Sequence, residues 1–519
     1  MTDHTALLRE LFASVLDVDL SDVDDDADFF LYGGHSLSAA TLASAIEEAC
    51  HVEVATLDVF EHPTPALLAE HLVGRTATAS TPTSAEDLRA PGSSVSAETA
   101  WLWMERQRDA ATGSAYTVPC LLSVDGEVRV DRLRSAVASL LAAHPALRTT
   151  FVEHLGAPRV VVSEPDPDQV LSIVEVPAVD GAIDRIVTEH VETPFDPATG
   201  ALFRVAALRD GSDWSLLLTA DHLVCDGRSL DILAADLAAA YDDLEALRAN
   251  VSVPSAPETS ARNSLDHWRT VLDPPPPPLP LPITAPRRGP VGDTGTAEVR
   301  LGPALTAAFR DRARAARVGP FAPMAAGVMK ALSELTGVED VCVGTAVDRR
   351  ARNGSPRTVG FHVATIPLRV RLSSGDTSAE VVGAVARAAI EGVDHSDVPF
   401  ADVVAELDPP RTAWRNPYFD VWVAVYPWVD TGPSSGIRLR GGPVPLRQGL
   451  FELSFQFVEK GDGDTVLTLQ YDRLRYDDAA ARRLVDRVVT ALRWVVDEAP
   501  SVPAPAASSA PAFSGFRFG

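Results

Sequence analysis

The stretch of sequence best equipped for chemistry is DHLVCDG, residues 221–227, which follows an apolar run predicted to be a buried strand. Its histidine, His222, carries the side chain that most readily accepts or donates a proton near neutral pH. An Asp-Gly pair, Asp226 and Gly227, stands four residues later, and a helix is predicted to begin near Ser229. The spacing predicts either a general base held by a turn or only a polar strand end.

A second candidate is Ser36 in LYGGHSLSAATL, which stands after two glycines at a predicted helix start. Serine is a favoured helix N-cap and glycine permits the turn before it, so capping alone would account for the residue. A hydrolase nucleophile would need the pattern GxSxG after a strand. Here Ser38 stands at the second glycine position and no strand is predicted before it, which disfavours that reading.

The elements around Ser36 predict a small helical bundle over residues 1–75. Apolar side chains share one helical face over residues 5–16, a second helix is predicted over residues 36–50, and Thr64-Pro65 has the cap-then-proline pattern of a helix start. Residues 1–75 hold 15 Asp and Glu against two Arg, about half of the chain's net charge of −27. This predicts a separate acidic domain that meets partners through charge, with solubility alone as the alternative.

The elements around His222 predict two mixed α/β halves. Residues 76–94 are small, polar and interrupted by proline, as in a linker. Helical and strand patterns alternate over residues 95–272 and again over 287–499, on either side of the proline-rich bridge at 273–286. Two halves of similar size indicate a duplicated architecture. The Ala-, Pro- and Ser-rich residues 500–519 are predicted to be disordered.

Composition excludes several classes of function. The net charge argues against general binding to nucleic acid. No apolar stretch approaches the roughly 20 residues that cross a bilayer, and the N-terminus shows no secretion signal. The cysteines are scattered without metal-ligand spacing, so no metal site is predicted and free thiols in a cytoplasmic protein are expected. These cysteines are Cys50, Cys120, Cys225 and Cys342.

Residues 1–75 resemble a peptidyl carrier protein. The resemblance rests on the acidic helical pattern, on Gly-Gly-His-Ser followed by an apolar residue, and on the tail DVFEHPTPALLAEHL. It implies that Ser36 is esterified with 4′-phosphopantetheine, and a helix N-terminus suits the added negative charge. The same likeness implies that Leu37, Leu42 and Phe60 form an apolar docking rim, although burial in the core is favoured for them.

Residues 95–505 resemble a nonribosomal peptide synthetase condensation domain, because seven weak motifs occur in the family's order. They are SVSAETAWLWMERQ, HPALRTTF, DHLVCDG, VCVGTAVDRRARN, VGFHVATIPLR, HSDVPFADVVAEL and RNPYFDV. The resemblance implies two chloramphenicol-acetyltransferase-like lobes that form a V around a tunnel. The expected fold is therefore an N-terminal all-α carrier bundle followed by a two-lobed α/β domain.

The resemblance also implies roles for single residues. In the family's His-His-x-x-x-Asp-Gly motif, His222 matches the second, catalytic histidine and Asp221 replaces the first. Asp221 would either orient the imidazole or raise its pKa, or turn its side chain elsewhere. Asp226 would form a buried ion pair with Arg350, with Arg349 as an adjacent competitor. Gly227 would permit the tight turn into the helix.

The expected reaction is the attack of an amine on a thioester, with His222 positioning the amine and accepting its proton. The expected partners are an adenylation domain acting on the carrier, a phosphopantetheinyl transferase and a downstream acceptor carrier in trans. No adenylation domain is expected within the chain, because the remaining length cannot hold one.

Three alternatives remain from the sequence. The chain could be a non-catalytic recruitment platform, which Asp221 and Ala364 (where the family usually has asparagine) favour slightly. It could instead be a related transferase that forms an ester, cyclises a peptide or changes stereochemistry. A hydrolase using Ser36 is the most distant alternative.

Overall fold

The computed structural model divides the chain into two compact units, of which the first comprises residues 1–108, 149–163 and 197–200. The residues described are 4–72, with gaps at 17, 19, 28, 30–41, 43–44, 47–48, 51, 53, 55–57 and 60–61, followed by 95–108, 114–154, 157–247, 261–285, 292–316, 318–350, 357–410, 415–426, 428–433 and 436–497. Two predicted features, the Ser36 helix start and the 500–519 tail, lie outside these residues.

The helical part of the first unit contains α1 (His4–Leu16), a short 3₁₀ turn (Leu20–Asp22) and α4 (Pro65–Leu72), which packs against α1. Thr64 caps α4 as predicted, because its Oγ1 accepts the amide of Leu67 at 3.2 Å. The buried core here is apolar and includes Leu8, Phe12, Phe29, Leu42, Ile46 and Leu68.

The first unit also holds α5 (Ala97–Arg108) and the two-stranded hairpin of β2 (Thr149–His154) and β3 (Ala157–Val162). Both segments were expected in the 95–272 half, but they group with the first unit.

The second unit contains two six-stranded sheets. The first sheet has the order β11-β12-β1-β6-β5-β4. Its strands are β1 (Thr117–Asp125), β4 (Leu171–Glu175), β5 (Phe203–Asp210), β6 (Asp213–Asp221), β11 (Val429–Asp430) and β12 (Arg438–Pro443). Its helices are α6 (Val130–Ala143), α7 (Ala182–Glu192) and α8 (Gly227–Asp242), with 3₁₀ turns at Pro145–Arg148 and Pro167–Gln169.

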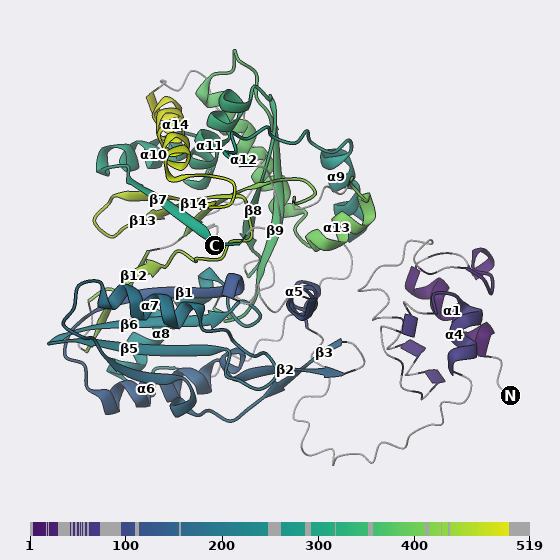
Figure 1. The fold of residues 1–519 in the computed structure, drawn as a ribbon, viewed down its shortest axis with the longest axis horizontal. Coiled ribbons are helices and arrows are strands. Elements are labelled where there is room, and N and C mark those ends of the chain that lie inside the picture. Colours follow the sequence, from purple (N-terminus) through teal and green to yellow (C-terminus); the bar gives the residue numbers. More distant parts are fainter. Residues whose placement is uncertain are drawn as a thin grey trace. The chain divides into compact units, whose positions relative to one another are not determined.

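The second sheet has the order β7-β14-β13-β10-β8-β9. Its strands are β7 (Thr294–Arg300), β8 (Asp340–Asp348), β9 (Val363–Arg371), β10 (Val421–Tyr426), β13 (Leu453–Glu459) and β14 (Thr465–Asp472). Its helices are α9 (Ala261–Leu272), α10 (Pro303–Ala316), α11 (Phe321–Thr336), α12 (Ser378–Asp394), α13 (Phe400–Leu407) and α14 (Asp478–Asp497). Figure 1 shows α10, α11, α12 and α14 gathered beside this sheet. Helix α11 contacts each of the other three.

The two sheets repeat one pattern, which agrees with the duplication expected from the sequence. In the first sheet β4 pairs in parallel with β5, and β5, β6 and β1 follow as antiparallel neighbours. In the second sheet β10 pairs in parallel with β13, and β13, β14 and β7 follow in the same way. Strand β6 and strand β14 therefore occupy equivalent places, each leading into a long helix.

The proline-rich bridge does not separate the sheets completely. Residues 273–285 form no helix or strand, and Leu279 and Leu281 are buried in the core of the second sheet. Strands β11 and β12 come after the bridge, yet β12 pairs with β1 from Cys120 to Asp125. The second half of the chain therefore completes the first sheet.

Candidate active site

His222 stands directly after β6, the strand that lies between β1 and β5 in the first sheet. The strand end is fixed by backbone hydrogen bonds, because Asp221 N donates to Leu202 O and His222 N donates to Tyr116 O, both at 2.9 Å. Residues 216–221 of the strand are all buried. The buried strand β6 thus places the imidazole of His222 at the edge of the core.

The His222 side chain is half-buried, and its Nδ1 is cut off from solvent without a hydrogen-bond partner among the described residues. The ring of Phe361 meets the imidazole edge-on, with centroids 4.8 Å apart. Burial lowers the pKa of His222 below its usual value, and the negative charges of Asp226 and Asp221 offset only part of that effect. His222 is therefore neutral at pH 7 and can accept a proton.

Asp226 caps helix α8 and is completely buried. Its Oδ1 accepts the amide of Ser229 at 2.8 Å and the hydroxyl of the same residue at 2.9 Å. Its Oδ2 accepts the amide of His362 at 2.9 Å. These bonds tie the start of α8 to the segment that precedes β9.

The arginine that pairs with Asp226 is Arg350, whose Nη2 lies 2.8 Å from Asp226 Oδ1. Arg350 is 1% exposed, and its guanidinium also donates to Asp348 Oδ1, Ser229 Oγ and the Thr358 carbonyl. Arg349 points elsewhere, with Nη1 3.4 Å from the carbonyl oxygen of Ser396. The predicted ion pair is present, and Arg350 rather than its neighbour forms it.

The charges of this pair stabilise each other in spite of their burial. Burial opposes ionisation of Asp226, but the charge and hydrogen bond of Arg350 and the amide of His362 outweigh it, so the pKa of Asp226 is lowered. Burial likewise opposes the charged form of Arg350, and Asp226 and Asp348 outweigh it and raise the pKa of Arg350. The pair is ionised at neutral pH.

Gly227 is the first residue of α8, and its backbone does not lie in the left-handed region. That Gly227 permits the tight turn into α8 therefore stays a prediction, and a left-handed backbone is not its basis. The backbone at Asp226, the N-cap of α8, is extended, with φ −134° and ψ −179°.

The other residues singled out from the sequence lie in β9, in the helical core or outside the described residues. Ala364 is 1% exposed within β9, where it pairs with Val347 of β8. Leu42 belongs to the helical core, which confirms burial rather than a docking rim. Ser36, Leu37 and Phe60 lie outside the described residues.

Two contributors to the site were not singled out from the sequence. Ser229 bridges the halves of the chain, since its Oγ accepts the amide of Gly360 at 3.1 Å and lies 3.0 Å from Gly360 O. Phe361 covers the His222 ring. The signal for Ser229 was its place three residues after a capping aspartate, and Phe361 lies inside the motif VGFHVAT.

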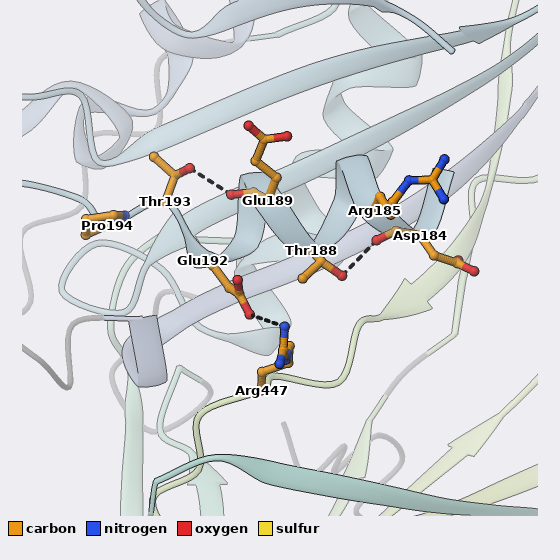
Figure 2. Close-up of a pocket in the computed structure, with 8 residues that line it drawn as sticks. All are labelled: Asp184, Arg185, Thr188, Glu189, Glu192, Thr193, Pro194 and Arg447. Atoms are coloured by element: carbon orange, nitrogen blue, oxygen red, sulfur yellow. Dashed lines mark hydrogen bonds and ion pairs between the residues drawn. The ribbon is translucent and has the colours of Figure 1, made fainter. Parts of the chain in front are cut away.

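A hollow of about 620 Å³ lies along helix α7 and does not include His222, Asp226 or Arg350. Figure 2 shows Thr188 and Thr193 turned back to carbonyls of their own helix and Glu192 paired with Arg447 at 3.3 Å. The lining residues are Asp184, Arg185, Thr188, Glu189, Glu192, Thr193, Pro194 and Arg447. Charged side chains make up most of the lining of this hollow. The residues predicted to carry the chemistry are not among them.

The cysteines, the metal-ligating residue types and the helix lengths point to no further kind of site among the described residues. The four cysteines are free thiols, and burial raises the pKa of Cys225 well above its usual value, so it is no thiolate nucleophile. Within the described ranges no cluster of three or more His, Cys, Asp or Glu side chains could hold a metal ion. No helix in the part of the chain that the structure describes is long and apolar enough to span a membrane.

Comparison with known proteins identifies both parts of the chain. Residues 102–504 match the condensation domain model, and residues 6–72 match the phosphopantetheine attachment site model. The sequence is 30% identical over 479 residues to the probable nonribosomal peptide synthetase CymA of Salinispora arenicola, covering 87% of this chain and 6% of that protein. It is 31% identical over 508 residues to tyrocidine synthase 3 of Brevibacillus parabrevis, covering 95% of this chain and 8% of that protein.

A solved structure supports the same conclusion for the fold. The first condensation domain of the CDA synthetase superposes with a TM-score of 0.66 at 21% identity, over 78% of this chain and 96% of that one. The family match covers most of the chain, and the two-lobed α/β fold with a helical carrier domain is confirmed. The chain therefore belongs to the condensation domain family found in nonribosomal peptide synthetases, and a phosphopantetheine attachment domain precedes its condensation domain.

Proposed function

We propose that this chain joins an acyl group held on its own carrier domain to an amine held on a downstream carrier, and that His222 accepts the proton of that amine. The observation that carries the proposal is the neutral imidazole at the end of β6, with a lowered pKa and a buried Nδ1 that has no hydrogen-bond partner in the described part of the chain. The partners proposed are an adenylation domain, a phosphopantetheinyl transferase and an acceptor carrier in trans.

The donor would be attached at Ser36, the serine of the Gly-Gly-His-Ser pattern within residues 6–72. 4′-Phosphopantetheine bound there supplies a thiol that holds the acyl group as a thioester. Ser36 lies outside the described residues, so this assignment rests on the family match and the sequence pattern.

The role of His222 follows from the proton balance of the reaction. When the amine nitrogen bonds to the thioester carbonyl carbon, the C–S bond breaks and the nitrogen must lose a proton. A free α-amino group has a pKa of about 7.7–8.0, so part of it is already neutral at pH 7. His222 takes the proton as the C–N bond forms and can return it to the departing sulfur, which leaves the imidazole unchanged.

Asp226 and Arg350 hold the site and do not touch the reacting atoms in this proposal. Their buried pair fixes the turn between His222 and α8. Asp226 also fixes the backbone at His362, next to the Phe361 ring that covers the imidazole. In this proposal the network holds the backbone on both sides of the His222 ring in place.

The first experiment tests Ser36. The protein is treated with a phosphopantetheinyl transferase and coenzyme A, and its intact mass is measured. We expect a gain of one phosphopantetheinyl group in the wild type and none in Ser36→Ala. Modification of Ser36→Ala at another serine would overturn the assignment.

The second experiment tests His222. Single-turnover amide formation is measured with a loaded donor and a loaded acceptor carrier, in the wild type and in His222→Ala. We expect the rate to fall by about 10²–10⁴-fold, the usual contribution of general base catalysis. His154→Ala is the matched control, because His154 is exposed at the end of β2. An unchanged rate in His222→Ala would remove the proposed role.

The same assay separates the alternatives. A recruitment platform gives no product even when both carriers are loaded. An ester-forming, cyclising or epimerising transferase gives a product whose mass or configuration differs from the simple amide. Mass spectrometry and chiral analysis of the released product decide among them.

A further inference from the structure

The strand that carries His222 has a counterpart in the second sheet. Strand β6 ends at Asp221 and is followed by His222 and Leu223, whereas β14 ends at Asp472 and is followed by Arg473 and Leu474. In both places a turn of the same length leads into a long helix, α8 or α14. The chain therefore contains two copies of one strand-turn-helix unit, and only one copy carries an imidazole.

Several backbone hydrogen bonds of the two turns correspond. His222 N donates to Tyr116 O, the residue before β1, at 2.9 Å, and Arg473 N donates to Asp293 O, the residue before β7, at 3.1 Å. The helix caps match as well, because the carboxylate of Asp226 accepts the amide three residues on, as the carboxylate of Asp477 does. The similarity also includes the bond from the amide three residues after each strand-end aspartate to its carbonyl, since Val224 N donates to Asp221 O and Arg475 N to Asp472 O, both at 3.0 Å.

The carboxylate at the strand end does the same thing in both copies. Asp221 Oδ1 accepts the amide of Leu223 at 3.0 Å, and Asp472 Oδ1 accepts the amide of Leu474 at 2.8 Å. Each bond joins an aspartate side chain to the backbone two residues on, which is the Asx-turn arrangement. Both aspartates are almost completely buried, with 1% and 0% exposure.

In the second copy the same bond is present although no imidazole follows the aspartate. Arg473 takes the place of His222 there, is half exposed, and donates through Nε to Thr294 O at 3.1 Å. Closing the turn is thus what the two aspartates share. We propose that Asp221 is a positioning residue, whose carboxylate oxygen closes the turn that holds His222 in place by accepting the Leu223 amide. The inference deepens the proposed function and rests on it for its consequence for the rate.

Closing the turn needs an acceptor oxygen and does not need a negative charge. Asp472 has a buried cation to neutralise, since Arg475 pairs with it and is 1% exposed, but the corresponding residue in the first copy is Val224. The negative charge of Asp221 acts on Arg204 and on His222 and opposes the effect of burial on the pKa of each. Asparagine keeps the Oδ1 acceptor and removes the charge, so it separates the two roles.

The experiment compares Asp221→Ala with Asp221→Asn in the full chain. We expect Asp221→Ala to lower kcat about 10–100-fold with little change in KM, because a small misplacement of a catalytic group is costly to the rate. Asp221→Asn should recover most of the lost rate. The acid limb of its kcat profile should move to lower pH only by the part of the His222 pKa that the charge of Asp221 supports. Asp213→Ala and Asp213→Asn are the matched controls, since Asp213 is exposed at the opposite end of β6.

Hydrogen exchange gives a readout that does not depend on activity. The amides of residues 222–225 should exchange faster in Asp221→Ala than in the wild type, and return towards the wild-type rate in Asp221→Asn. If Asp221→Ala does not fold, the Asp221→Asn pair of measurements still decides.

The outcomes are distinct. A shifted pH profile in Asp221→Asn, with a loss of rate as large as in Asp221→Ala, means that charge on the ring is what matters and overturns the inference. Normal exchange and a normal rate in Asp221→Ala overturn it as well. If His222→Ala keeps full activity, the proposed function fails, and the exchange data alone then report whether Asp221 closes the turn.

Discussion

At the residue scale, the proposed chemistry depends on a neutral imidazole at His222. The Phe361 ring and the buried strand end exclude water from Nδ1 of His222, and this burial lowers its pKa. The carboxylates of Asp226 and Asp221 pull the other way without restoring the usual value. A neutral ring can accept a proton at once, whereas a protonated ring cannot.

The pH dependence of the rate should show this directly. As pH falls below about 7.7, protonation of the amine lowers the rate, and the slope of log rate against pH becomes one. Below about 6.5, as the pH reaches the lowered pKa of His222, the acceptor is protonated as well and the slope of log rate against pH rises from one towards two. His222→Ala should keep a slope of one throughout. A second limb that persists in this variant would assign it to another group.

At the element scale, α8 begins where it does because Asp226 caps it and Arg350 neutralises the cap. The two residues come from different halves of the chain, on either side of the proline-rich bridge. The bonds therefore hold α8 against the segment between β8 and β9, which also carries Phe361.

Removing either partner of this pair should destabilise the protein strongly. We expect Asp226→Ala and Arg350→Ala each to lower the free energy of unfolding by about 3–5 kcal/mol, because each leaves a buried charge without its partner. The double variant should lose less than the sum of the two. Denaturant unfolding measures all three, and additive losses would contradict a direct pairing.

Helix packing in the second sheet gives a test with opposite signs at two glycines. A Cβ on Gly327 of α11 would lie 2.4 Å from Leu492 Cδ2 and 3.2 Å from its Cα in α14, so Gly327→Ala should cost about 1–3 kcal/mol. A Cβ on Gly383 of α12 would meet only the flexible Arg387 side chain at 3.6 Å. Gly383→Ala should therefore stabilise the helix by up to about 1 kcal/mol. Thermal unfolding of both variants checks the contrast.

At the scale of the whole molecule, the first and second sheets depend on each other. Strands β11 and β12 come from the second half of the chain and complete the first sheet. At the site, Asp226 of the first half bonds to His362 and Arg350 of the second half. His362 lies within that network. Burial and the positive charges of Arg350 and Arg349 lower the pKa of His362 to about 4, with Asp226 opposing them.

This shift predicts acid lability. Because the folded form holds His362 neutral, the unfolded chain binds more protons between about pH 6.5 and pH 4, and stability is lost as pH falls through that window. The shift corresponds to a loss on the order of 3 kcal/mol. His362→Phe keeps a ring and cannot be protonated, so its melting temperature should fall less between pH 6.5 and pH 4. Parallel curves for the two proteins would show that His362 is not the source.

Much of the site could be predicted from the sequence because its parts are local. A strand that stops at Asp221, a histidine, and a capping aspartate before a helix are each defined within a few residues by hydrogen-bonding chemistry. Thr64 before Pro65 was predictable for the same reason. The order of seven motifs then indicated the family, which residues 102–504 match.

Only the tertiary structure decided which partner each of these groups meets. Arg349 and Arg350 are adjacent and chemically identical, and the backbone direction at the end of β8 sends Arg350 to Asp226. The role proposed for Asp221 could be inferred only by comparison with Asp472, which lies far along the chain and makes the same bond in its own turn. Sequence determines what a residue can bond to locally, whereas long-range partners depend on how distant strands pack, which no local pattern records.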